Sequence, residues 1–354
     1  MSRFPEPLLT AALVPLHFTT ENFPPCEQFS VWQQHMAPLL DVHLPDNASA
    51  EGGFIVQQAV WNLGGVLLVQ QSAPPFHYER SWDKVRFSPI DHWQITFLHS
   101  GHSWTGVEGN IVENEPGTVE VRSLGQPFRG RATATDSVSL IIPIDHFADR
   151  GGLPPASSNV VLGGHRAKML IDFVSSLEAS LHQLTNDELP STKDSFREII
   201  FDTIAPLVWQ SGTNDQISQI GLMTRARRFI QSNLASHDLT PDALSKELAI
   251  SRTRLYEMFE SSGGVLNYIR QQRLSAAHAM LIDISDTRKI TDVAAALGFD
   301  SAANFSRAFT QQFGYSPSNV RKMSCMGGVH IQASSDQSTK LTFEVLLRTL
   351  GLVL

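Results

Sequence analysis

Two segments of this chain, fifty residues apart, follow one pattern. The sequence ISRTRLYEMFESSGG at 250–264 aligns with DSAANFSRAFTQQFG at 300–314, with serine, phenylalanine and glycine at matching places and Leu255 where the second copy has Phe305. Repetition of this kind indicates two copies of one small folding unit. The C-terminal part of the chain is therefore expected to hold two similar helical units.

The second copy predicts two short helices joined by a tight turn. Apolar residues recur at helical spacing over 290–297, and Gly298 can adopt the positive φ that ends a helix. Asp300 or Ser301 can cap the next helix, which would bury Phe305 and Phe309. The opposite side of that helix would expose Ala302, Ala303, Ser306, Arg307 and Thr310.

The first copy repeats this arrangement with different outward residues. Leu244 and Leu248 lead to Ser251 as the cap, and Leu255 and Phe259 point inward. The outward face would carry Arg252, Thr253, Tyr256 and Glu257. A short helix, a tight turn and a second helix with an exposed N-terminal half are typical of a helix-turn-helix, whose second helix enters the major groove of DNA.

A third helix is predicted between the copies, over 267–283, and is long enough to act as a spacer. Two units on one rigid helix can place two reading helices about 34 Å, one DNA turn, apart on the same side of a duplex. This geometry gives the duplication a purpose.

The segment that holds the two copies also differs from the rest of the chain in charge. Residues 1–221 hold 12 Lys and Arg against 24 Asp and Glu, whereas residues 222–322 hold 13 against 9. A basic module joined to an acidic one is what a polyanion-binding domain attached to a different activity would show.

The N-terminal half predicts an antiparallel β-structure. Over 52–145, short segments rich in Val, Ile, Thr and Trp are separated by Gly and Pro, which favours a sandwich or barrel over a parallel sheet. Two amphipathic helices follow between Arg166 and Trp209 and either dimerise or pack on the sandwich. A polar linker is expected at 210–216. The fold class predicted is therefore α+β and multidomain.

Residues 222–322 resemble the DNA-binding domain of the AraC/XylS family of bacterial transcription regulators. The resemblance lies in GFDSAANFSRAFTQQFGYSPSNVR, which is similar to the family's Gly-Phe, Phe-Ser-Arg-x-Phe, Phe-Gly-x-Ser-Pro and final Arg pattern. It implies that the outward residues of both second helices face bases or nearby phosphates. Two residue types depart from the pattern: Glu257 would repel phosphate, and the alanines of the second copy offer only apolar contacts, so direct readout would depend on Ser306 and Arg307.

The strand-rich half resembles the cupin-like effector-binding domain found in part of that family. The implied organisation is a jelly roll over 1–160, a helical linker with a possible dimer contact over 161–216, the DNA-binding domain over 217–323, and a tail of unknown role over 324–354. The tail is expected either to cover a groove on the protein or to have little structure. The resemblance further implies an activator that responds to a small molecule, binds double-stranded operator DNA as a homodimer, and contacts RNA polymerase.

A small-molecule site is expected inside the sandwich. Apolar walls and a cation for a carboxylate could come from Trp61, Arg80, Trp93, Phe97, Trp104 and Arg122. If one of these arginines points inward, the effector is expected to be an anion. For each aromatic residue, packing in the core is the competing interpretation.

Two other readings stay open. His77, His92, His99 and His102 raise the possibility of a metal-dependent cupin enzyme, but the usual His-x-His with a following carboxylate is missing, so neither a metal nor another cofactor is expected. Alternatively, the sandwich serves only dimerisation and DNA binding is constitutive. With two separated cysteines and no apolar run long enough to span a bilayer, a cytoplasmic location is expected.

Overall fold

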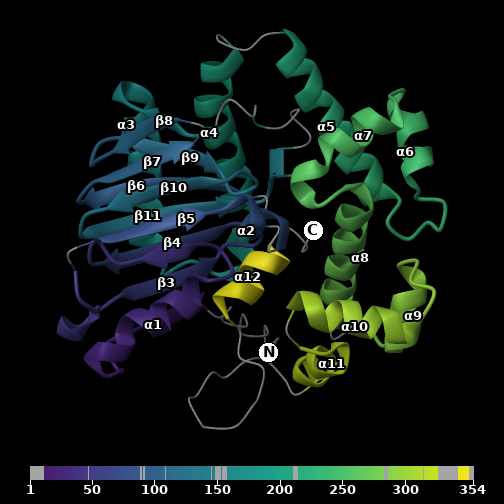
Figure 1. The fold of residues 1–354 in the computed structure, drawn as a ribbon, viewed down its shortest axis with the longest axis horizontal. Helices are drawn as coiled ribbons and strands as arrows, with labels where there is room; N and C mark the ends of the chain where they lie inside the picture. The colour runs from purple at the N-terminus through teal and green to yellow at the C-terminus, as the bar shows by residue number, and fades with distance from the viewer. Residues whose placement is uncertain are drawn as a thin grey trace, which may run out of the picture.

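The computed structural model describes residues 12–46, 48–87, 90, 92–107, 109–144, 146–147, 153, 158–209, 214–282, 286–313, 315–325 and 342–350. An N-terminal β-sandwich and a C-terminal group of helices form its two halves, and α4 and α5 connect them (Figure 1). This arrangement confirms the predicted fold class. None of the described helices is long and apolar enough to cross a membrane.

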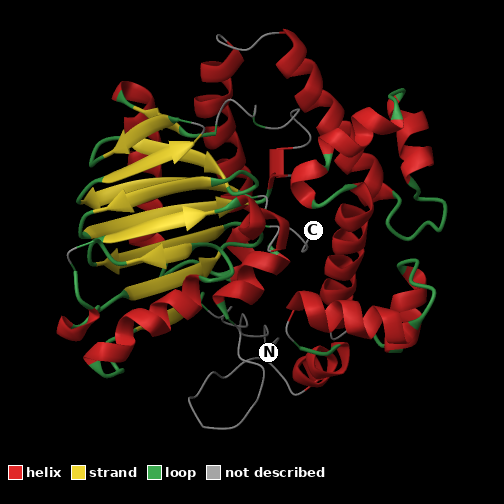
Figure 2. Ribbon diagram, in the orientation of Figure 1, coloured by secondary structure: helices red, strands yellow, loops and turns green. Residues whose placement is uncertain are grey.

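Two antiparallel sheets make up the sandwich (Figure 2). The seven-stranded sheet has the order β1 (Leu16–Thr19), β3 (Gln57–Asn62), β4 (Leu67–Ala73), β11 (Thr135–Ile142), β6 (Trp93–Ser100), β9 (Val119–Ser123) and β12 (Val160–Leu162). The five-stranded sheet has the order β2 (Asp41–His43), β5 (Phe76–Arg80), β10 (Phe128–Ala132), β7 (Ser103–Val107) and β8 (Asn110–Asn114). Helices α1 (Pro25–Met36) and α2 (Trp82–Phe87) accompany these strands.

Alternation along the strands gives the seven-stranded sheet two different faces, because successive side chains of a strand point to opposite sides. On β9, Val119 and Val121 belong to an apolar cluster with α3 (Gly164–Ser180) and α4 (Leu189–Trp209). Glu120 and Arg122, between and beyond them, point to the other side, toward the five-stranded sheet. The two helices expected after the sandwich are therefore α3 and α4, and both pack on this sheet.

The C-terminal half is helical, with α8 at its centre. Its helices are α5 (Asn214–Ser232), α6 (Pro241–Leu248), α7 (Arg252–Met258), α8 (Val265–Ile282), α9 (Ile290–Ala296), α10 (Ala302–Phe313) and α11 (Pro317–Cys325). Helix α8 contacts α7, α9, α10 and α11. Two apolar clusters form along it, one with α5, α6 and α7 and the other with α9, α10 and α11. The two copies of the repeat are thus two small cores sharing one central helix.

Three predicted features lie partly or wholly outside the described residues: the polar linker, the repeated glycine and the C-terminal tail. The predicted polar linker lies partly outside the described residues, and α5 already begins at Asn214. The repeated Gly314 also lies outside them. Within the tail, α12 (Phe343–Thr349) is described and packs against the sandwich, as the groove-covering alternative expected.

The second small core predicts the cost of losing its central aromatic ring. Phe309 is fully buried and contacts the rings of Phe305 and Phe313. Phe309→Ala is expected to lower the free energy of unfolding by about 3–5 kcal/mol, because it removes apolar burial and leaves a cavity. The exposed neighbour Thr310→Ala should change it by less than about 0.5 kcal/mol. Urea unfolding followed by circular dichroism measures both, and equal effects would contradict the packing described.

Candidate nucleic-acid interface and interior cavity

The first helix-turn-helix is formed by α6 and α7. Helix α6 ends at Ala249, a non-glycine residue in the left-handed region with φ of 55°. Ser251 then caps α7, where its Oγ accepts a hydrogen bond from the backbone N–H of Arg254 at 3.1 Å. Leu255 and Phe259 are fully buried, which fixes the side that α7 turns away from the core.

The second helix-turn-helix is formed by α9 and α10. Gly298 has a φ of 73°, as the sequence predicted, and the Oγ of Ser301 accepts from the N–H of Asn304 at 3.4 Å. An added Cβ at Gly298 would lie 2.9 Å from the guanidinium of Arg273, so the turn excludes larger residues for two reasons. The turn therefore depends on both backbone freedom and close packing.

Most of the predicted outward residues are accessible. On α7, Arg252, Thr253, Tyr256 and Glu257 are all exposed. Two of their charges have partners within the first unit: Arg252 forms an ion pair with Asp242, and Glu257 lies 3.3 Å from Arg254. DNA contact by Arg252 would therefore compete with an existing ion pair.

On α10, Ala303 and Arg307 are exposed, and Ala302 and Ser306 are half-buried. Asn304 is exposed beside them and was not among the predicted residues. Its amide can pair with adenine, which neither alanine can do. Its position in the first turn of a capped helix was the sequence signal that could have identified it.

Arg273 on α8 connects the two units. Its Nε donates to the carbonyl of Leu234 at 3.1 Å and its Nη2 to that of Ser236 at 2.8 Å, both in the segment between α5 and α6. Its Nη1 donates to the carbonyl of Gly298 at 3.3 Å, in the turn of the second unit. One guanidinium thus joins the first unit to the second, at the turn that sets the direction of α10.

A cavity of about 80 Å³ lies between the two sheets. Its apolar wall includes Leu40, Val69, Phe76 and Ile141. Its polar wall consists of Gln58, Gln71, Gln94, Thr96, Ser103, Thr135, Ser137, Ser139, Tyr78 and Arg122. Such a mixed lining suits a small molecule that has both an apolar and a polar part.

Arg122 and Glu120 form a buried ion pair at this cavity. Nη2 of Arg122 lies 3.5 Å from Oε2 of Glu120, and the two side chains are only 7% and 1% exposed. Among the described residues, Nε and Nη1 of Arg122 and both carboxylate oxygens of Glu120 have no hydrogen-bond partner. Burial alone would lower the pKa of Arg122, but the charge of Glu120 and the Tyr78 hydroxyl together outweigh it, and the pKa lies above its usual value. The arginine is therefore charged and has two unused donors.

The rings beside this pair hold the arginine in place. Its guanidinium carbon lies 5.3 Å from the ring centre of Tyr78 and 4.7 Å from that of Phe128, within cation–π range. Burial also raises the pKa of the Tyr78 hydroxyl, which lies 2.7 Å from Oγ1 of Thr105. The tyrosine is accordingly neutral and stays a hydrogen-bonding group.

Of the six residues predicted for the effector site, Arg122 alone lines this cavity. Trp61, Trp93 and Phe97 belong instead to the cluster under α3 and α4, because they occupy the other face of the seven-stranded sheet. Trp104 contacts Arg131 and His102. These residues therefore lie apart from the cavity, although their order in the sequence placed them together, and their predicted contact with an effector stays a prediction.

Arg80 has a structural role. The side chain is fully buried, and its guanidinium donates to the carbonyls of Leu39, Leu124 and Ile90 at 2.7, 2.6 and 3.3 Å. It closes one end of the sandwich by joining three segments. Arg80 does not line the cavity, and its predicted contact with an effector stays a prediction.

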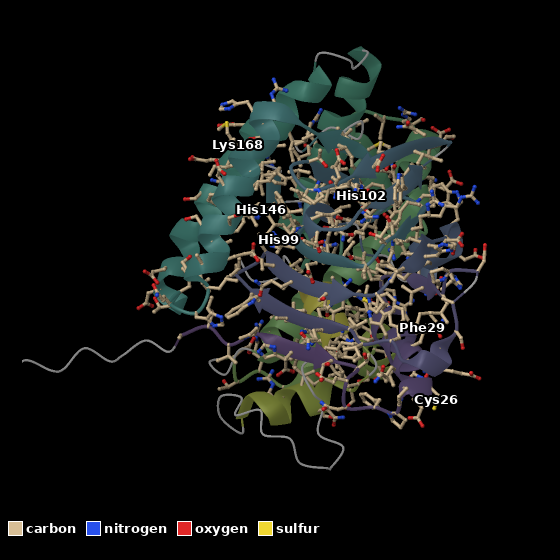
Figure 3. All side chains as sticks on the ribbon, turned by 90° about the vertical axis from the view of Figure 1, so that its left-hand side faces the viewer. Cys26, Phe29, His99, His102, His146 and Lys168 are labelled. Atoms are coloured by element: carbon tan, nitrogen blue, oxygen red, sulfur yellow. The ribbon has the colours of Figure 1, made fainter. Side chains whose placement is uncertain are left out.

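The histidines considered for a metal site do not share one place. His92 bonds to the carbonyl of Leu347, whereas His99 pairs with Glu178 at 3.1 Å. Figure 3 shows the labelled His99 and His102 at separate places on the sandwich. His102 lies 3.2 Å from Glu113 and 3.8 Å from Glu115 on the surface, and these three residues could each offer one atom to a cation. This group is separate from the interior cavity, since none of its members lines it.

The two halves define a class of protein: a β-sandwich with an interior cavity joined to a pair of helix-turn-helix units. A family model described as a helix-turn-helix domain matches residues 244–323. The solved structure of the AraC-like transcriptional activator CuxR is 43% identical, with a TM-score of 0.54, and the match covers 75% of this chain and 96% of CuxR.

The chain is also similar to named transcriptional activators. XylDLEGF operon transcriptional activator 2 of Pseudomonas putida is 31% identical over 117 residues, which is 31% of this chain and 74% of that protein. Transcriptional activator NphR of a Rhodococcus species is 32% identical over 103 residues, which is 28% of this chain and 30% of NphR. The chain thus spans less than a third of NphR. It belongs to the AraC/XylS family of transcription regulators.

The second helical unit is expected to lose stability in mild acid. Burial lowers the pKa of His278 from 6.5 to about 4, and its Nε2 lies 2.6 Å from the hydroxyl of Tyr315. The neutral ring is favoured in the folded state, so its contribution is complete above pH 6.5 and is lost progressively between 6.5 and about 4. The full loss is on the order of 3 kcal/mol.

His278→Gln is expected to flatten this pH dependence, while an exposed histidine changed in the same way, His237→Gln, should leave it intact. Urea unfolding at several pH values between 4 and 7 measures the slope. An unchanged slope in His278→Gln would show that other groups cause the acid sensitivity.

Proposed function

We propose that this protein is a transcription regulator in which a small effector, held inside the sandwich, controls how the paired helix-turn-helix units engage operator DNA. The observation that carries the proposal is the exposed pair of capped helices, α7 and α10, held on α8 and joined by Arg273. Helix α7 would read one groove and α10 the next on the same side of the duplex.

Each predicted domain would have its own function. Residues 1–160 would hold the effector, 161–216 would connect and support a homodimer, and 217–323 would bind DNA. The relatives are named as transcriptional activators, and the proposal adds activation of transcription through contact with RNA polymerase. The cytoplasm is the compartment where these parts meet.

The cavity also suggests the chemistry of the effector. Arg122 lines the cavity and offers two donor nitrogens without hydrogen-bond partners, so a matching ligand carries an anionic acceptor. A small hydroxy acid or amino acid offers a carboxylate for Arg122 and a second polar group for Gln94 or Ser139, and its apolar part would lie against Phe76 and Leu40. Anionic character fits the earlier expectation for an inward arginine.

Arg307 tests the DNA-binding half. It is exposed on α10, and Arg307→Ala is expected to weaken binding to a selected operator by about 1–3 kcal/mol and to relax one base preference. Arg129→Ala, an exposed arginine on the sandwich, is the control of equal charge and should leave affinity within twofold. Selection from random genomic fragments, followed by fluorescence anisotropy at fixed salt, supplies operator and affinity. Equal affinities for the two variants would refute the assignment.

Arg122 tests the effector half. Arg122→Met leaves Glu120 buried without its counter-charge, so the free energy of unfolding should fall by about 3–5 kcal/mol. The double variant Glu120→Gln, Arg122→Met removes both charges and should recover most of that loss. Thermal denaturation with a panel of small hydroxy and amino acids then separates folding from binding.

In that panel, at least one acid should raise the Tm of the unaltered protein and have no effect on the double variant. Methyl esters of the same acids serve as ligand controls and should be weaker. If the double variant responds like the unaltered protein, the ion pair is structural only, and a protein that binds its operator regardless of every acid would fit constitutive regulation.

A further inference from the structure

The C-terminal helix α12 lies against the sandwich although it follows the DNA-binding half in the chain (Figure 1). Its buried residues are Phe343, Leu346, Leu347 and Leu350, which recur at the spacing of one helical face. All four belong to the apolar cluster between the two sheets, together with Trp32 and Tyr78. The helix therefore uses one complete face to cover an opening of the sandwich.

Phe343 is the part of α12 that reaches the cavity. It lines the cavity, and the other lining residues all lie between Met36 and Ile141. Its ring stacks on His35, with ring centres 5.4 Å apart and planes 17° from parallel. The tail thus supplies one wall of a cavity that is otherwise built from the sandwich.

A hydrogen bond fixes the other end of the helix. Nε2 of the buried His92 lies 2.8 Å from the carbonyl oxygen of Leu347, and this carbonyl belongs to the last turn of α12. Thr342 caps the first turn, since its Oγ1 accepts from the N–H of Val345 at 3.2 Å. The helix is therefore anchored by the stacked ring at its start and by His92 near its end.

The docked position of α12 is held by few interactions and can be lost reversibly. With seven residues, α12 is too short to be stable as an isolated helix, so its helicity and its docking are lost together. The strands around the cavity, in contrast, are held by ladders such as the seven-residue pairing of β11 with β4. Of the described elements that line the cavity, α1 and α12 lie outside the sheets, and α12, with seven residues against twelve, is the shorter.

The helix also lies next to α8, the central helix of the DNA-binding half. Whatever displaces α12 from the cavity therefore changes a contact of the element that holds both reading helices. A covering helix in this place connects the cavity to the DNA-binding half by direct contact.

We propose that α12 is a reversible lid: when seated it closes the cavity with Phe343, and when released it opens the cavity and withdraws from α8. A ligand of the cavity would enter only from the released state and would shift the population between the two. This regulatory meaning rests on the proposed effector function, whereas the docking itself does not.

Hydrogen exchange of the full chain, read by mass spectrometry, tests the lid. Amides of residues 346–350 should exchange at least tenfold slower than in the full-chain variant Phe343→Ala, Leu347→Ala, and at least tenfold faster than amides of the central strand β11. Val345→Ala, which alters a half-buried position outside the buried face, is the matched control and should stay within threefold of the unaltered protein.

Two results would overturn the proposal. Exchange of α12 at the rate of an unstructured peptide would show that it is not seated, and exchange as slow as that of β11 would show that it is a fixed part of the core. A second measurement uses a fluorescein-labelled peptide of residues 341–354, which should bind the Phe343→Ala, Leu347→Ala chain at least tenfold more tightly than the unaltered chain, and equal binding contradicts the lid. Binding of the selected operator by both chains, measured in parallel, separates failure of the lid from failure of the proposed function.

Discussion

The guanidinium of Arg273 is the interaction on which the orientation of the reading helices depends. It donates hydrogen bonds to three backbone carbonyls, two before α6 and one in the turn before α10. These bonds hold the two helix-turn-helix units in a fixed orientation on α8, which is called the fixed frame below. Without it, the two small cores would be joined by α8 but not registered against each other. Gly298 is part of the same device, because any side chain there would occupy the space of the guanidinium. The frame matters because helices that address one duplex must differ in position by about one DNA turn.

The sequence predicted this half of the protein well because the signals were local. Serine caps, a turn glycine and phenylalanines at helical spacing act over a few residues, and each reappears in the structure as a contact. The role of Arg273 could not be read in this way, since its partners lie 25 to 39 residues away in the chain. Asn304 was missed for a simpler reason: the predicted outward face took in Ala302 and Ala303 but left out the amide that directly follows them.

In the sandwich, the sequence predicted the strands, but of the six residues expected to contact an effector only Arg122 lines the interior cavity. A change of one position along a strand moves a side chain to the opposite face, so Trp93 and Phe97 pack under the helices while Gln94 and Thr96 line the cavity. Arg80 and Arg122 look alike in the sequence. Arg80 donates hydrogen bonds to three backbone carbonyls, whereas Arg122 keeps two donor nitrogens without hydrogen-bond partners. That difference depends on long-range pairing, and so does the seating of α12, whose place on the sandwich no local pattern encodes.

A hydroxyl-radical footprint of the full chain on its selected operator tests the central claim most directly, namely that α7 and α10 read one duplex from a fixed frame. Two protected patches are expected on the same side of the DNA, centred about ten base pairs apart, and their spacing should not vary among selected sites. A single patch, or two patches at variable spacing, would contradict the fixed frame and the function built on it.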